Sequence, residues 1–387
     1  MRASLLFLAL SVVACGGQTS ANPAATQDTG PLTEDTGALI GDTPAVEDTG
    51  VVSEDAPAPV KDPITAPDEA WTWVPVKGTK CANGSETGLG ANLTKKSKKA
   101  IVYLMGGGAC WDATSCGLGL AANLNGYTDG NFASDMKKYG ATGPFDRTDA
   151  ANPFKDYSFF FIPYCTGDVH AGNKISEYGG KKYHHYGYLN MTYNLERIIP
   201  TLKGSGIDYA ILSGSSAGGF GALWNFPRFQ DGLGKATHVD IIDDGGPPLR
   251  PAFMPTTLQQ QWNNAWGLDT TVPAGCTKCT AAEGYHNAIE FFATKYPGHR
   301  ASLISSYQDK VIRSYFQVSG AKMEEGLKDF ADNVINKAPD WRVYYVAGDK
   351  HVFLGDKLST ITSGGVILAD FLTKQVSGDA SWASVRP

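Results

Sequence analysis

DYAILSGSSAGGFGALWNF, residues 208–226, decides the expected fold, because an apolar run breaks there into glycines and serines and then resumes at helical spacing. The first part, Tyr209–Leu212, predicts a buried strand, and Phe220–Phe226 predicts the start of a helix. Between them, residues 214–218 fit G-x-S-x-G, in which the central serine lies on a strained turn between strand and helix. We therefore predict Ser216 as a nucleophile, against the alternative of a plain Gly/Ser turn.

The rest of the chain alternates between predicted strands and predicted helices. Continuous apolar runs predict further strands at residues 100–104, 157–162, 239–242, 301–306 and 342–346. Helical spacing predicts helices at residues 188–202, 258–266, 281–296, 322–336 and 358–376, of which the second and third are expected to form a lid or cap. This alternation indicates an α/β fold, with a mostly parallel sheet and helices on both faces.

Three residue types with complementary chemistry follow predicted strands. Ser216, Asp309 and His351 occur in the order Ser, Asp, His that nucleophile-elbow hydrolases use. The C-terminal ends of parallel strands meet at one edge of a sheet, so His351 can accept the Ser216 proton while Asp309 orients the imidazole. Asp244 also follows a strand and remains the alternative acid.

A triple glycine follows the predicted strand at residues 100–104. Gly106–Gly108 lack the Lys-Ser/Thr of a phosphate-binding loop, so we expect the amides of Gly107 and Gly108 to join that of Ala217 in an oxyanion hole. A polar cluster with Asp168 and His170 ends a later strand. We interpret it as a loop that shapes the pocket, with metal ligation as the alternative.

The N-terminal residues predict export. The chain has 387 residues and a formal net charge of -6, which argues against nucleic acid as a partner. Residues 1–15 read as a signal peptide, and the small residues before Cys15 resemble a bacterial lipobox, which implies cleavage before Cys15 and attachment of lipid to it. An ordinary secretory signal is the alternative. We expect a lipoprotein of the outer membrane or cell surface, anchored to the membrane by that lipid.

A spacer is expected between the lipid and the folded domain. Residues 16–67 are rich in Asp, Thr, Gly and Pro, with Asp-Thr-Gly starting at Asp28, Asp35 and Asp48, and nothing there resembles a twelve-residue calcium loop. A flexible chain of roughly 50 residues spans about 40 Å. The catalytic domain is then expected at residues 68–387.

Six cysteines follow the spacer, an even number suited to disulfides in an oxidising compartment. Cys110 with Cys116 and Cys276 with Cys279 are close enough in sequence to close small loops, which leaves Cys81 to pair with Cys165. The second of the close pairs also fits a redox motif or half of a metal site, but no second C-x-x-C accompanies it.

Together these motifs resemble the pectin acetylesterase family, which includes the animal carboxylesterase Notum. The resemblance rests on residues 104–110, 152–154, 163–168, 214–219, 305–309 and 349–354. It implies an α/β-hydrolase fold, a triad of Ser216, Asp309 and His351, an oxyanion hole from Gly107, Gly108 and Ala217, and neither metal nor organic cofactor. Ala109 departs from the pattern, because relatives often have an aromatic residue before the cysteine, and this puts the pocket wall there in doubt.

The expected function is that of an exported carboxylic ester hydrolase. The resemblance favours removal of acetyl or short acyl groups from an acetylated polysaccharide such as pectin. A lipid or protein deacylase of the Notum type is the alternative within the enzyme class. A non-catalytic surface binding protein on a hydrolase scaffold is the alternative outside it.

Overall fold

The computed structural model describes residues 61–387. The expected signal peptide, Cys15 and nearly all of the expected spacer lie outside the described residues. An eight-stranded sheet runs through this region. Its strands are β1 (Thr72–Val76), β2 (Thr87–Asn92), β3 (Lys99–Leu104), β4 (Ser158–Ile162), β7 (Tyr209–Ser215), β8 (His238–Asp244), β9 (Ala301–Ser306) and β10 (Trp341–Val346).

The strand order is β1-β2-β4-β3-β7-β8-β9-β10. All pairs from β4 to β10 are parallel, and only β2 pairs antiparallel with both its neighbours. The mostly parallel α/β sheet expected from the sequence is therefore confirmed. β3 and β7 are adjacent, with Leu104 opposite Gly214. This register puts the glycine-rich loop after β3 beside the turn that carries Ser216.

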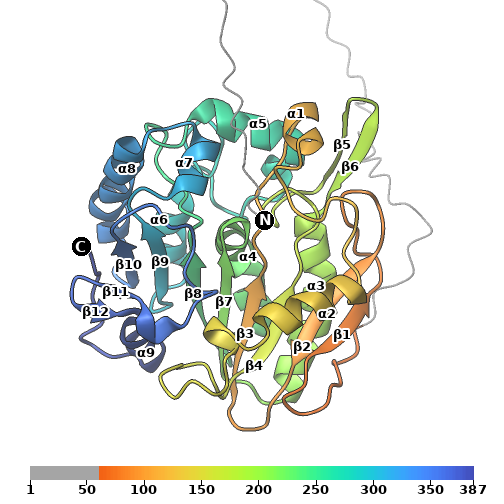
Figure 1. Cartoon of the computed structure of the whole chain (residues 1–387), viewed down its shortest axis with the longest axis vertical. Helices are drawn as coiled ribbons and strands as arrows, with labels where there is room; N and C mark the ends of the chain where they lie inside the picture. The colour runs from red at the N-terminus through yellow and green to blue at the C-terminus, as the bar shows by residue number, and fades with distance from the viewer. Residues whose placement is uncertain (1–60) are drawn as a thin grey trace, which may run out of the picture. The chain divides into compact units, whose positions relative to one another are not determined.

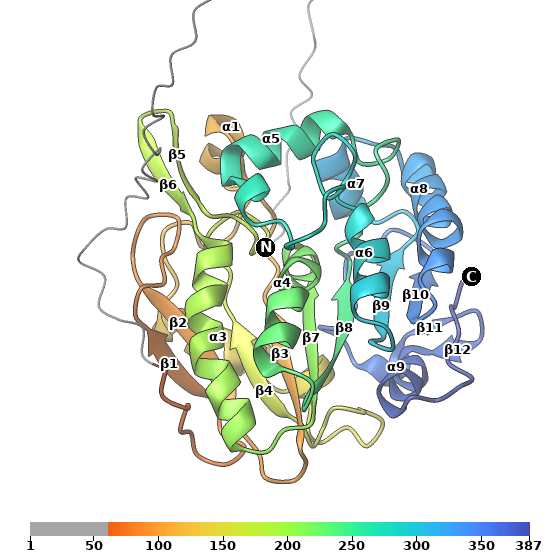
Figure 2. The ribbon, with the colours of Figure 1, turned by 180° about the vertical axis from the view of Figure 1, so that it is seen from behind.

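Helices cover both faces of the sheet (Figures 1 and 2). They are α1 (Ala113–Gly117), α2 (Asp129–Tyr139), α3 (Gly187–Gly204), α4 (Ala217–Leu233), α5 (Thr256–Trp266), α6 (Asn287–Lys295), α7 (Lys310–Phe316), α8 (Gly320–Asn333) and α9 (Leu368–Ser377). Short 3-10 turns occur at Gly143–Phe145, Leu268–Thr270, Ile335–Lys337 and Leu358–Thr360. Small antiparallel pairs are formed by β5 (Lys174–Tyr178) with β6 (Lys181–His185) and by β11 (Thr362–Ser363) with β12 (Val366–Ile367).

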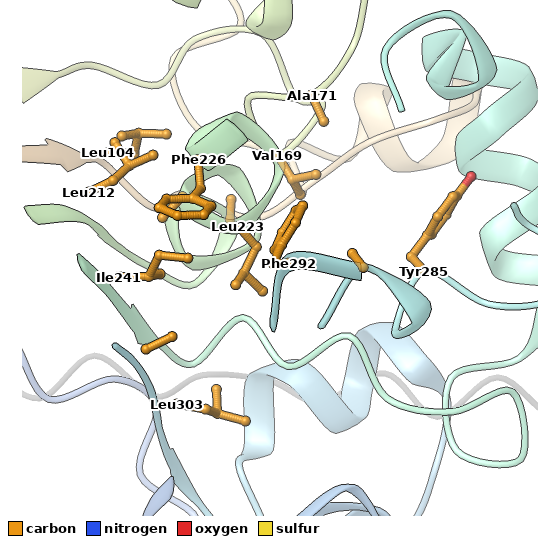
Figure 3. Packing of buried hydrophobic residues seen from close by; sticks show 14 of the residues in the cluster. Leu104, Val169, Ala171, Leu212, Leu223, Phe226, Ile241, Tyr285, Phe292 and Leu303 are labelled. Atoms are coloured by element: carbon orange, nitrogen blue, oxygen red, sulfur yellow. The ribbon is translucent and has the colours of Figure 1, made fainter. Parts of the chain in front are cut away.

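A separate apolar core lies on each face of the sheet. On one face, side chains of α3, α4, α6 and α8 are buried with those of the sheet. Figure 3 shows Leu223 and Phe226 of α4 lying among the strand residues Leu104, Leu212 and Ile241. On the other face, α2 and α9 are buried against the sheet. The two cores hold the strands in place, so the loops at their C-terminal ends start from fixed positions.

The C-terminal edge of the sheet carries most of the added structure. The segments after β3, β4, β8 and β9 form α1, the β5–β6 hairpin, α5 and α7, and both views show them together above the sheet (Figures 1 and 2). The edge strand β10 is paired as well, because the Tyr345 N–H donates to the Val385 carbonyl at 2.9 Å and the Val385 N–H donates to Val343 at 2.8 Å.

Two helix predictions were too long. The segment expected to be helical at residues 281–296 is helical only from Asn287, because Gly284 adopts φ +102° and interrupts it. The segment expected at residues 358–376 is helical only from Leu368, because Gly364 and Gly365 adopt φ +51° and +76° and turn the β11–β12 hairpin. Only glycine adopts such angles readily.

Packing begins before the boundary expected at residue 68. Ile64 is buried, and its N–H donates to the Thr201 hydroxyl of α3 at 2.7 Å. Disulfides join Cys81 to Cys165, Cys110 to Cys116 and Cys276 to Cys279. Within residues 61–387, no helix is both long and apolar enough to span a bilayer.

Candidate active site

Ser216 lies on a sharp turn between β7 and α4. Its backbone has φ 57° and ψ -120°, a strained conformation for a residue with a side chain. The glycines on either side are required by contact: a Cβ at Gly214 would clash with the Gly218 carbonyl, and one at Gly218 would clash with the Leu104 carbonyl. The G-x-S-x-G spacing therefore serves the close approach of strand and helix, which leaves the Ser216 side chain at the edge of the sheet.

The glycine-rich loop after β3 lies directly against this turn. A Cβ at Gly106 would be 2.5 Å from the Ser215 carbonyl oxygen and 3.2 Å from the Ser216 Cβ. Gly107 and Gly108 have φ +150° and +75°. Within residues 61–387, the N–H groups of Gly107, Gly108 and Ala217 have no acceptor in the protein. Free amides beside a serine are what an oxyanion hole requires.

The His170 side chain contacts the backbone at the start of the glycine-rich loop. It is buried, and its Nε2 bonds to the Met105 carbonyl at 2.8 Å, so this nitrogen carries the proton. Burial lowers the pKa of His170 to about 4, which keeps the ring neutral. Asp168 accepts from Thr166 and from the Gly187 N–H, and burial raises its pKa to about 6. Each side chain forms a hydrogen bond with a backbone group, His170 with the Met105 carbonyl and Asp168 with the Gly187 N–H. These contacts agree with the interpretation that this loop shapes the pocket.

Asp309 and His351 are in direct contact. Nδ1 of His351 lies 2.7 Å from Oδ2 of Asp309, so Nδ1 donates the proton and Nε2 is left to face other groups. The other carboxylate oxygen of Asp309 accepts from the N–H groups of Val311 and Ile312 at the start of α7. The carboxylate is completely buried and both its oxygens are used. It therefore orients the imidazole firmly.

The turn at Gly245 lies beside both Ser216 and this pair. The Ser216 N–H donates to the Asp244 carbonyl at 2.7 Å, so the turn starts beside the serine. A Cβ at Gly245 would lie 3.7 Å from Cε1 of His351 and 3.8 Å from Oδ2 of Asp309. The three predicted residues thus surround one turn. Within residues 61–387, the hydrogen bond from His351 to Asp309 is formed, whereas none joins the Ser216 hydroxyl to His351.

Asp244, the alternative acid, faces elsewhere. Its carboxylate accepts from the N–H groups of Phe353 and Leu354, at 2.9 and 2.8 Å, and from the Ser215 hydroxyl at 2.7 Å. Tyr103 donates in turn to Ser215 at 2.8 Å. Burial raises the pKa of Asp244 to about 6, and the donated hydrogen bonds oppose that shift.

This network fixes the loop that carries His351. Val352, between His351 and Phe353, has φ 56°, which is unfavourable for a β-branched residue. The hydrogen bonds to Asp244 hold the loop in that conformation. The roles of Tyr103, Ser215 and Asp244 in positioning this loop were not predicted, because no motif marks the backbone groups that they bind.

A narrow pocket opens beside Ser216. Its volume is about 20 Å³, and Ala109, Phe220, Trp262 and Tyr315 are among the residues that line it. A second cavity of about 30 Å³ lies behind it and shares Phe220 and Trp262 with it. Both spaces are small and lined mainly by apolar groups as the side chains stand.

A possible metal cluster lies away from this pocket. The donor atoms of His238, Asp240 and His299 lie within 4.8 Å of one another, where β8 and β9 begin. The Asp240 oxygens already accept from His238, from the Tyr209 hydroxyl and from the Arg300 N–H. Protein donors thus satisfy this carboxylate.

A family model described as Pectinacetylesterase matches residues 70–295, more than half of the chain. The chain belongs to the pectinacetylesterase family. The matched range includes the turn at Ser216 and the glycine-rich loop but ends before Asp309 and His351. The assignment of these two residues therefore depends on the geometry described above.

Relatives and solved structures agree with that family. The palmitoleoyl-protein carboxylesterase notum2 of Xenopus laevis is 30% identical over 38% of this chain and 29% of its own length. Pectin acetylesterase 5 of Arabidopsis thaliana is 29% identical over 44% of this chain and 39% of its own length. The matches thus span little more than a third of these relatives at most. The structure of the Wnt deacylase Notum from Drosophila has a TM-score of 0.59 at 19% identity, covering 81% of this chain and 95% of that one.

Proposed function

We propose that this chain is a serine carboxylesterase that removes acetyl or similarly short acyl groups from an acetylated polysaccharide. The observation that carries the proposal is the strained turn at Ser216, which lies beside free backbone amides. The Asp309–His351 pair, which borders the adjacent turn at Gly245, supports it. Membership of the pectinacetylesterase family supports the reaction class.

The proposed reaction begins with attack of the Ser216 hydroxyl on the ester carbonyl. Nε2 of His351 accepts the hydroxyl proton, and Asp309 stabilises the imidazolium that results. The amides of Gly107, Gly108 and Ala217 bind the oxygen that becomes negative. The sugar hydroxyl leaves with the proton from His351, and water then releases the acid from the acyl-enzyme. Because catalytic hydrogen bonds often tighten only with substrate bound, we expect the Ser216–His351 contact to form in that complex.

The size of the pocket favours a short acyl group. The space beside Ser216 is small and apolar, which suits the methyl group of an acetyl ester. A longer chain must move Phe220 or Trp262 to reach the cavity behind them. The alternative, a deacylase for long chains, is supported by the names of the Notum relatives. Comparing kcat/KM on acetyl and octanoyl p-nitrophenyl esters separates the two, with the acetyl ester expected to be favoured.

Two experiments test the catalytic proposal. Replacing Ser216 with Ala should lower kcat on p-nitrophenyl acetate by about 10⁶-fold, because the nucleophile is lost. A fluorophosphonate probe should label the wild-type protein at Ser216 and leave the variant unlabelled. If the variant retained full activity, the proposal would be wrong. A wild-type protein that takes up no label and cleaves no ester would support the binding-protein alternative.

We also propose that the protein is exported and carries lipid on Cys15. Three disulfides within residues 61–387 support an oxidising compartment. Replacing Cys15 with Ser should move the protein from the membrane fraction to the soluble fraction of its host. Retention in the membrane fraction would contradict the lipid anchor.

A further inference from the structure

A groove of about 400 Å³ lies at the same edge of the sheet as Ser216. It is formed by α5, the first strand of the β5–β6 hairpin and the loop that precedes α1, which both views place together (Figures 1 and 2). The residues that matter for its chemistry are Trp111, Asp112, Glu177, Tyr178, Gln261 and Asn264. The groove is thus built from three segments that are distant in sequence.

Trp111 connects this groove to the Ser216 pocket. Its ring centroid lies 6.2 Å from that of Trp262 and 6.3 Å from that of Tyr315, and both of these rings line the pocket. Trp111 itself lines the groove. Trp111 thus contacts the walls of the pocket and lines the groove.

The groove offers unused polar groups beside aromatic rings. Among the residues that the structure describes, the Trp111 indole N–H, the Glu177 carboxylate and the Gln261 amide have no hydrogen-bond partner in the protein. Glu177 and Gln261 are exposed. Aromatic rings with an apolar body, together with a few convergent polar groups, suit a ligand that has both C–H faces and hydroxyls. A sugar ring is such a ligand.

The charge of the groove distinguishes between two kinds of glycan. Asp112 and Glu177 contribute two carboxylates, and Lys174 contributes an ammonium that donates to the Asn264 carbonyl at 2.8 Å. The groove itself therefore has one more carboxylate than ammonium group. A polyuronate, with one carboxylate on each sugar, would meet like charge here, whereas a neutral glycan would not.

We propose that this groove binds sugar units of a neutral acetylated glycan while an acetyl ester on the same chain occupies the Ser216 pocket. This rests on the proposed esterase function. It adds a binding site and a preference against anionic pectin, and both can fail while the esterase activity stands.

The test compares a small ester with an acetylated xylo-oligosaccharide. A Glu177→Ala, Gln261→Ala double variant should raise KM on the oligosaccharide by about tenfold, the size expected when one or two hydrogen bonds are lost. Its kcat/KM on p-nitrophenyl acetate should stay that of the wild type. Thr257→Ala is the matched control, because Thr257 is exposed on the same helix and does not line the groove.

Several results would contradict the proposal that the groove binds sugar. Equal losses on both substrates, or no change on the oligosaccharide, would show that Glu177 and Gln261 do not bind sugar. A wild-type protein that cleaves p-nitrophenyl acetate but no acetylated glycan would also contradict the groove proposal, while the esterase proposal would stand. A wild-type protein that cleaves neither substrate would instead contradict the esterase proposal. The groove proposal, which rests on it, would then be wrong as well.

A charge variant tests the neutral preference. The wild type should have a lower KM for acetylated xylo-oligosaccharide than for acetylated oligogalacturonide of equal length at low salt. Glu177→Lys should lower KM for the oligogalacturonide several-fold, and added salt should remove that gain. An equally low wild-type KM for both glycans, or no effect of Glu177→Lys, would contradict the proposed preference.

Discussion

Asp244 ends β8, Asp309 follows the neighbouring parallel strand β9, and both are completely buried, yet their carboxylates contact different groups. Asp309 contacts the imidazole of His351 and also caps α7. Asp244 contacts the backbone of Phe353 and Leu354, just after His351. One carboxylate orients the ring and the other fixes the loop that carries it. The end of a parallel strand thus determines where a side chain lies but not which group it meets.

The largest effect that tests this difference is expected from Asp309→Asn. The amide preserves the shape and an acceptor for the α7 cap, but it does not stabilise the imidazolium, so kcat on p-nitrophenyl acetate should fall by about 10⁴-fold. The melting temperature should change little. If Asp309→Asn were nearly as active as the wild type, Asp309 would not be the triad acid.

Asp244→Asn should have an intermediate effect on rate. The Phe353 N–H lies 2.9 Å from both carboxylate oxygens, so an amide places its NH2 group against this donor and weakens the hydrogen bonding of the His351 loop. Loss of a hydrogen bond to a charged group costs about 1.5–3 kcal/mol of unfolding free energy. Displacement of His351 should lower kcat by about 10²-fold. Chemical denaturation and kinetics check both effects. A larger kcat loss here than in Asp309→Asn would reverse the two roles.

Ser215→Ala should have a smaller effect. It removes one hydrogen bond to Asp244 and the acceptor of Tyr103, but it leaves both N–H bonds to the His351 loop. We expect a loss of about 1 kcal/mol in unfolding free energy and a fall in kcat of only a few-fold. Ser215→Thr, which keeps a hydroxyl, is the matched control. A loss as large as that of Ser216→Ala would make Ser215 the nucleophile instead.

His170→Gln should barely change the rate at neutral pH, and its effect should appear in acid. The pKa of His170 is about 4 when folded and close to 6.5 when unfolded. The unfolded chain therefore binds more protons between these values, and the unfolding free energy falls as pH falls from about 6.5 to about 4. Gln keeps a donor for the Met105 carbonyl but does not titrate in this range.

Denaturation at several pH values should therefore give a flatter profile for the variant than for the wild type. His185, with its pKa also lowered to about 4, retains part of the slope. Asp168 and Asp244, with pKa values raised to about 6, act in the opposite direction in both proteins. Identical profiles would show that His170 does not contribute to acid sensitivity.

The parallel sheet could be predicted because its central strands are continuous apolar runs between helical segments. The sequence analysis did not predict β1, β2, α1, α7 or the β11–β12 pair, and it also missed the β5–β6 hairpin and α2, which had usable signals. The β5–β6 hairpin turns at Gly179 and Gly180, both with positive φ, and α2 begins with a capping box formed by Thr128 and Asn131. The helices predicted too early, before Asn287 and Leu368, contain glycines that break them.

The candidate site could be predicted only in part, for a physical reason. Ser216 is marked by local sequence, since its turn demands small neighbours. The partner of His351 depends on the paths of two loops. The sequence alone therefore could not decide whether Asp244 or Asp309 is the triad acid. The contact with the imidazole of His351 favours Asp309.

The pairing of Val385 with β10 has a consequence for handling the protein. It covers a row of main-chain donors and acceptors that would otherwise invite a strand from a second copy. Removing the last few residues would not affect the chemistry of Ser216, but it would expose the unpaired edge of β10. Preparations trimmed at that point should form aggregates while their remaining soluble fraction keeps full specific activity.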